Sequence, residues 1–135
     1  MQVYQWPIDK FVAGFIGSPP MNFIPGKLHM GTFKSDSEDI ILYFNESGLK
    51  EIENQSVQLG IRPEDIHLRK LSNQFQPATF ILEVLEPLGN ESILHLSCIN
   101  RLNVVSRTHE TEVTAETGSP LNVYIDIEQI HFFDD

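Results

Sequence analysis

Hydrophobic side chains recur at every second position in three stretches of this 135-residue chain, residues 80–85, 93–98 and 121–127. Successive side chains of a β-strand point to opposite faces of a sheet, so this period predicts half-buried strands. The chain also contains eight Val, fourteen Ile and six Thr, but three Ala. Because β-branched residues fit a pleated sheet better than a helix, we expect a mostly β fold.

Shorter stretches predict further strands. These are residues 27–33, 40–44, 57–62, 102–106 and 111–116. Residues 35–39, with three acidic residues and two serines, predict an exposed hairpin loop. A total of about eight short strands is typical of a small barrel or sandwich. The predicted fold class is therefore an all-β small barrel.

The start of the chain breaks this pattern. Apolar residues between positions 8 and 16 recur at spacings of three and four, which predicts one short amphipathic helix over residues 7–16. Pro7 is favoured in the first turn of such a helix. The helix is expected to end near Gly17, because Pro19 and Pro20 cannot continue helical hydrogen bonding.

The charge of the chain excludes several kinds of partner. Nineteen Asp and Glu against nine Lys and Arg give a formal net charge of −10, and no Lys or Arg follows Arg107. Such a surface repels nucleic-acid backbones and anionic membranes. No apolar run approaches the ~20 residues that span a bilayer, and the single cysteine, Cys98, suits a reducing compartment. We expect a cytoplasmic protein with no nucleic-acid partner and no direct membrane insertion.

The motifs of common catalytic sites are missing. Gly26-Lys27 lacks the first glycine and the hydroxyl of a phosphate-binding loop. His109-Glu110 begins a zinc-protease string, but position 113 is Val rather than His. The five histidines are scattered, and Cys98 lies among apolar strand residues. The sequence thus predicts no catalytic, cofactor-binding or metal-binding residues, and favours a binding or interaction module.

Four stretches carry a resemblance when they are considered in order. They are FVAGFIGSPPMNF at 11–23, LGIRPEDI at 59–66, EPLGNE at 86–91 and HFFD at 131–134. Together they resemble the C-terminal regulatory domain of carbohydrate-importer ATPases, the maltose and glycerol-phosphate class of ABC transporter subunits. The resemblance covers almost the whole chain.

The resemblance implies an OB-like barrel of the transport-associated (TOBE) type. Residues 1–22 would be the terminal helix and linker of a preceding nucleotide-binding domain, and residues 23–135 the regulatory domain. It further implies a homodimer, permease subunits contacted by the parent ATPase domain, and a regulatory protein as partners. The parent would lie at the inner face of the cell membrane and would use ATP and Mg²⁺. This part itself would be non-catalytic and would need no cofactor.

The resemblance also implies roles for individual residues. The positions implied to contact a partner or regulator are Phe23, Gly60, Arg62 and Glu64, with Phe23 and Gly60 on or near the surface. The positions implied to be structural are Gly17, Pro19, Met21, Asn22, Gly89, Asn90, Glu91 and Phe133. The residues themselves also allow a structural role for the 60–64 turn, with Arg62 paired to Glu64. Gly89-Asn90 is typical of a hairpin turn, and Phe132 or Phe133 would plug the barrel.

One alternative function stays open at this stage. Related transport-associated folds bind small ligands or oxyanions between subunits. Such a site needs positively charged donors, and the candidates in the later part of the chain are Arg62, Lys70, Arg101 and Arg107.

Overall fold

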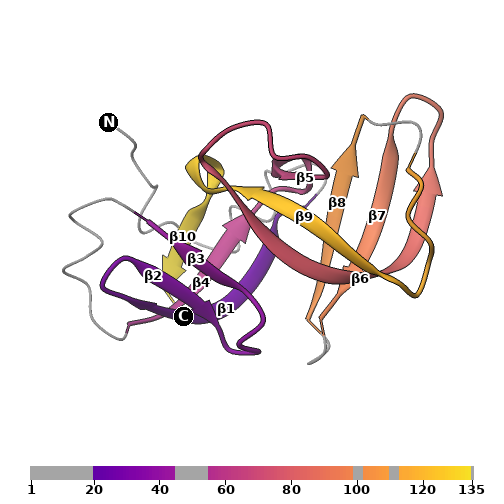
Figure 1. Cartoon of the computed structure of the whole chain (residues 1–135). Helices are drawn as coiled ribbons and strands as arrows, with labels where there is room; N and C mark the ends of the chain where they lie inside the picture. The colour runs from indigo at the N-terminus through magenta and orange to yellow at the C-terminus, as the bar shows by residue number, and fades with distance from the viewer. Residues whose placement is uncertain (1–19, 45–54, 99–101, 110–112, 135) are drawn as a thin grey trace.

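The computed structural model describes residues 20–44, 55–98, 102–109 and 113–134, which form two five-stranded antiparallel sheets (Figure 1). Sheet A has the order β10-β4-β1-β2-β3 and sheet B the order β5-β9-β6-β7-β8. The strands of sheet A are β1 (Asn22–His29), β2 (Thr32–Ser35), β3 (Ile41–Tyr43), β4 (Gln55–Ile61) and β10 (His131–Asp134). Those of sheet B are β5 (Ile66–His67), β6 (Phe75–Pro87), β7 (Ser92–Ser97), β8 (Asn103–Thr108) and β9 (Pro120–Asp126). Two 3₁₀ turns, η1 (Pro63–Asp65) and η2 (Ile127–Gln129), precede β5 and β10.

One hydrophobic core joins the inner faces of the two sheets. Leu59 and Phe132 enter it from sheet A, and Phe80, Leu94 and Val123 enter it from sheet B, all almost fully buried. The alternating pattern of the sequence supplies these residues, because every second side chain of each strand points inward. The described strands therefore confirm the predicted all-β, OB-like fold.

Sheet B is strongly curled. The register of β6 against β7 shifts between Leu82 and Val84, so Glu83 is an extra residue on β6. A bulge of this kind bends a strand and increases its twist. The curl brings the edge strands β5 and β8 together, and the Ser106 hydroxyl donates to the Ile66 carbonyl at 2.7 Å. Sheet B is consequently a half-barrel (Figure 1).

Two side-chain amides connect each sheet to the edge of the other. Asn22 of β1 donates to the carbonyl of Val105 on β8 at 2.9 Å and accepts from its N–H at 2.8 Å. Gln76 of β6 bonds both backbone groups of Tyr43 on β3 in the same way. An amide offers the donor and acceptor of a peptide unit, so each side chain acts as a one-residue continuation of the partner sheet.

The structure corrects several strand predictions. Residues 27–33 are not one strand, because the chain turns at Met30 and Gly31, both with positive φ, between β1 and β2. Residues 113–116, the described part of the stretch 111–116, form no strand. The alternation did not predict β5 and β10, so the described residues form ten strands rather than eight. In the predicted 35–39 loop, Ser35 is buried and accepts the Ile40 N–H at 3.1 Å. The predicted helix at 7–16 lies outside the described residues.

Candidate functional site

The predicted contact residues meet on the outer face of sheet A, where β1, β4 and β10 lie side by side. Phe23 of β1 is the register partner of Gly60 on β4, and Gly60 is also the partner of His131 on β10. Phe133 is two residues further along β10, on the same face as His131. Met21, just before β1, packs with Phe133 and Phe23 in a small cluster outside the main core. We call Met21, Phe23, Gly60 and Phe133 the Gly60 patch.

The Gly60 patch is closely packed around the missing side chain of the glycine. A Cβ atom at Gly60 would lie 2.6 Å from Cε2 of Phe133 and would overlap Sδ of Met21. The Phe23 and Phe133 rings pack edge to face, with 5.6 Å between centroids. Met21 and Phe133 are buried, Gly60 is buried, and Phe23 is half-buried. Gly60 was predicted to lie on or near the surface; it is on the outer face of sheet A but is not exposed, because two neighbouring side chains occupy the space in front of it.

The turn after β4 carries the charged residues of this corner. Arg62 is half-buried and Glu64 is exposed, and the Asp65 N–H donates to the Arg62 carbonyl at 2.9 Å. The described residues show no ion pair between Arg62 and Glu64. The Arg62 charge acts instead on two other groups: it adds to the effect of burial in lowering the pKa of His131, and it opposes part of the rise that burial causes in the pKa of Asp65. The turn therefore holds its cation beside the patch rather than against Glu64.

His131 lies between the patch and the turn. Burial, followed by the Arg62 charge, lowers the pKa of His131. Its Nδ1 atom is buried and has no hydrogen-bond partner among the residues that the structure describes. The imidazole ring stacks on Phe133 with centroids 6.4 Å apart. At neutral pH this ring is therefore uncharged and acts as part of the apolar packing.

The other predicted residues lie in three places. Asn22 forms the amide contact with β8, a role that its motif position alone did not reveal. Gly89 has a φ of 89° in the turn between β6 and β7, where Asn90 is exposed and Glu91 pairs with Arg107 at 2.6 Å. The hairpin prediction for Gly89-Asn90 is thus confirmed. Gly17 and Pro19 lie outside the described residues.

The sequence analysis missed one group of side chains. Asp65, His67 and Asp126 each offer a ligand atom within 4.8 Å of the others. The spacing of Asp65 and His67 by two residues was visible in the sequence, but Asp126 reaches them only because β5 pairs with β9. Burial, with the charges of Glu64 and Asp126, raises the pKa of Asp65 to about 6.

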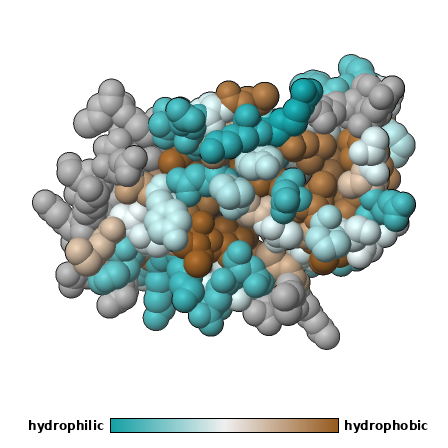
Figure 2. Space-filling model, in the orientation of Figure 1, coloured by the Kyte–Doolittle hydropathy of each residue, from teal (hydrophilic) through white to brown (hydrophobic). Residues whose placement is uncertain are grey.

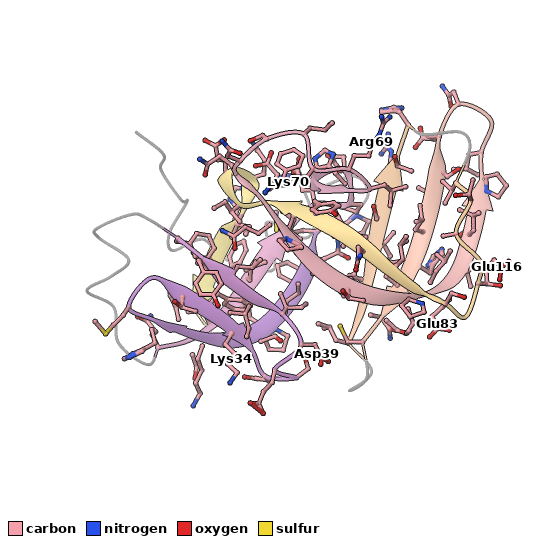
Figure 3. All side chains as sticks on the ribbon, viewed as in Figure 1. Lys34, Asp39, Arg69, Lys70, Glu83 and Glu116 are labelled. Atoms are coloured by element: carbon pink, nitrogen blue, oxygen red, sulfur yellow. The ribbon has the colours of Figure 1, made fainter. Side chains whose placement is uncertain are left out.

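The structure adds no support for an oxyanion site or for a reactive cysteine. Of the candidate donors, Arg107 is paired with Glu91, Lys70 is exposed in the loop between β5 and β6 (Figure 3), and Arg101 lies outside the described residues. Burial, together with the Asp39 charge, raises the pKa of the Cys98 thiol to about 11. This thiol is protonated at neutral pH and has little nucleophilic character.

Two family models match the chain. Residues 17–66 match the MalK OB fold domain and residues 59–133 match the TOBE domain. The chain belongs to the TOBE domain family. The two matches overlap at residues 59–66, the stretch that contains Gly60, Arg62 and Glu64.

Curated relatives extend this similarity over nearly the whole chain. The sn-glycerol-3-phosphate import ATP-binding protein UgpC of Shigella sonnei is 34% identical over 99% of this chain, and that of Vibrio cholerae is 30% identical over 98%. The maltose/maltodextrin import ATP-binding protein MalK of Escherichia coli K12 is 31% identical over 98% of this chain. This chain spans 35–37% of the length of these relatives.

A solved structure shows the same fold. The cytoplasmic molybdate-binding protein ModG superposes with a TM-score of 0.65 over 84% of this chain and 96% of its own, at 9% sequence identity. At this identity the similarity concerns the fold alone. The described residues contain no helix long and apolar enough to cross a membrane.

Proposed function

We propose that this chain is the regulatory and dimerisation domain of the ATP-binding subunit of a sugar ABC importer. The observation that carries the proposal is the similarity to UgpC and MalK, which covers 98–99% of this chain and includes both domain matches. The chain spans about a third of those relatives. In this proposal the domain is non-catalytic, and ATP and Mg²⁺ are used by another part of the parent subunit.

The proposed partners follow from the parent's function. A second copy of the domain gives the homodimer, the permease subunits bind the parent's ATPase domain, and a regulatory protein binds the TOBE domain. The parent would work in the cytoplasm at the inner face of the membrane. A binding function also agrees with the pattern of charges, because the chain is strongly acidic and has no phosphate-binding loop.

We place the regulatory contact at the turn that follows Gly60. Glu64 is exposed and Arg62 half-exposed, so both side chains are available to a protein partner. Phe23 lies on β1 opposite Gly60 and is half-buried. Gly60 then has a supporting function, because its lack of a side chain lets Met21 and Phe133 pack behind the turn. A rigid base beneath charged side chains favours specific recognition.

Sedimentation equilibrium of the purified chain tests the dimerisation. We expect a weak monomer–dimer equilibrium, since a small isolated interface binds weakly. If the 60–64 turn is part of the dimer interface, Glu64→Lys changes the association constant without changing the melting temperature. Glu116→Lys is the matched control, because Glu116 is exposed on the sheet B side of the molecule (Figure 3). A chain that stays monomeric at millimolar concentration argues against the dimerisation function.

Calorimetric titration with Mg-ATP tests the non-catalytic assignment. We expect no saturable heat, because the chain lacks the glycine-rich loop and lysine that hold the phosphates. Saturable binding in the micromolar range would contradict the assignment of ATP to another part of the parent subunit.

A further inference from the structure

Three metal-ligating side chains come together where η1, β5 and the end of β9 meet. In the antiparallel pair of β5 and β9, Ile66 is opposite Ile125 and His67 is opposite Tyr124. Continuing this register by one residue places Asp65 opposite Asp126. Asp65 is the last residue of η1, and His67 follows it by two residues, in β5. Their ligand atoms and that of Asp126 all lie within 4.8 Å of one another, and all three residues are half-buried.

Two of the three side chains are held in place by other groups. The Asp126 carboxylate accepts the N–H of Glu128 at 3.1 Å, as the N-cap of η2. The His67 ring stacks on Phe75 with 4.6 Å between centroids and an interplanar angle of 18°. Contacts of this kind orient the ligands of a metal site and reduce the entropy lost when the ion binds.

The third side chain is the Asp65 carboxylate. It is half-buried and makes no hydrogen bond or ion pair among the described residues. Like charges directly opposite each other in an antiparallel pair are destabilising, and the continued register places the half-buried Asp65 and Asp126 carboxylates in such a pair.

We propose that Asp65, His67 and Asp126 form a binding site for one divalent transition-metal ion, with Zn²⁺ as the preferred ion. Two carboxylate oxygens and one imidazole nitrogen suit Zn²⁺ better than Mg²⁺ or Ca²⁺, which favour all-oxygen sites. Three protein ligands leave at least one coordination position for water. The ion would neutralise the opposed carboxylates and would fix η1, the turn that carries Arg62 and Glu64, to the end of β9.

Titration calorimetry of the metal-free chain with ZnCl₂ at pH 7.5 tests the site. We expect saturable binding of one Zn²⁺ per chain and a rise in melting temperature with Zn²⁺. Asp65→Asn and His67→Gln should each weaken binding by at least ~10-fold. Asp65→Asn is the more informative variant, because the Asp65 side chain has no hydrogen bond to lose. Absorption by Co²⁺ bound in place of Zn²⁺ reports the geometry of the ligands independently of stability.

Two matched variants serve as controls. Asp36→Asn removes an exposed carboxylate from the loop after β2, and His95→Gln removes the histidine that pairs with Glu86 on the outer face of sheet B. Both should bind Zn²⁺ as the unchanged chain does. The absence of saturable binding would overturn the proposal, as would binding that the site variants and the controls weaken equally. If Asp65→Asn raises the melting temperature in EDTA while the unchanged chain binds no Zn²⁺, the two carboxylates share a proton and no metal site exists.

Discussion

The Gly60 patch on the outer face of sheet A and the outer face of sheet B are built for different surroundings. On sheet A, the Gly60 patch is apolar, and Met21 and Phe133 are buried although they point away from the main core. On sheet B, outward side chains pair with one another: Thr79 donates to Asn122 at 2.8 Å, and Glu86 pairs with His95. These sheet B groups are exposed or half-exposed. The comparison teaches that alternation reveals which strand positions point outward, but not whether they point into water.

Figure 2 shows this mixture on one face of the molecule, with apolar residues visible between groups of hydrophilic ones. Apolar area removed from water contributes about 25 cal/mol per Å² to folding, whereas an exposed ion pair contributes at most about 1 kcal/mol. Substitutions on the two outer faces should therefore differ in cost by severalfold.

The largest effect is expected for Phe133→Ala. The ring is fully buried and packs on Phe23 and in front of Gly60. Its removal should lower the free energy of unfolding by about 3–4 kcal/mol, from lost burial and the cavity left behind. Urea denaturation measures the change. Leu88→Ala, at a residue 55% exposed near the end of β6, is the control and should change stability little. A loss below about 1 kcal/mol for Phe133→Ala would show that the Gly60 patch resembles the outer face of sheet B.

A smaller loss of unfolding free energy is expected for Gly60→Ala. The added methyl overlaps Met21 and Phe133, and overpacking of this kind costs about 1–3 kcal/mol. Met21 has a flexible side chain, so Gly60→Ala combined with Met21→Ala should cost less than the sum of the two single changes. A double-mutant cycle by thermal unfolding measures this coupling. Strict additivity would mean that Met21 is not what restricts position 60.

The two amides that connect the sheets provide a comparison of their own. Asn22→Ala breaks two partly buried hydrogen bonds to Val105, and we expect a loss of about 2 kcal/mol. Gln76→Ala breaks the corresponding pair to Tyr43, but these groups are exposed and water can replace the amide, so the loss should be about 0.5 kcal/mol. Chemical denaturation of both variants checks the order. Equal losses would contradict the role assigned to burial.

A pH-dependent difference is expected at His131. Because burial, with Arg62, lowers its pKa in the folded state, the neutral ring is favoured by folding. Stability from this group is present above its ordinary pKa of about 6.5 and is lost as the pH falls below it. His131→Gln should therefore make the unfolding free energy fall less steeply between pH 7.5 and 5. The unchanged chain and the His131→Gln variant both contain Asp65 and His67, so the difference between their curves of unfolding free energy against pH reports the contribution of His131. Parallel curves would exclude this contribution.

The smallest effect is expected on the outer face of sheet B. Glu86→Gln removes the charge of an exposed carboxylate that pairs with His95. Exposed pairs contribute little, so the change in unfolding free energy should be below about 0.5 kcal/mol and should shrink further in high salt. Thermal unfolding at two salt concentrations provides the measurement. A loss comparable to that of Asn22→Ala would contradict the contrast between the faces.

Local patterns predicted the fold well and the site only in part. Alternation located the inward positions of β6, β7 and β9, and Gly89-Asn90 predicted its turn. The alternation of apolar residues did not predict β5, which has two residues and is too short to show a period. The burial of Gly60 and the meeting of Asp65 with Asp126 depend on strand neighbours that are distant in sequence. The spacing of residues along one strand holds no information about which strand will lie beside it.

The side-chain amides of Asn22 and Gln76, which connect the two sheets, have a consequence for how this chain can be divided. The strand β1 that supplies Asn22 lies in the part matched by the MalK OB fold model, and β8, which receives it, lies in the part matched by the TOBE model. The Gln76 contact runs in the opposite direction. If either part were expressed alone, β3 or β8 would lose the side chain that covers it, and an uncovered edge strand invites aggregation. We therefore expect the two matched parts to fold and unfold together as one cooperative unit. Proteolysis or gene fusion should keep or lose both parts together.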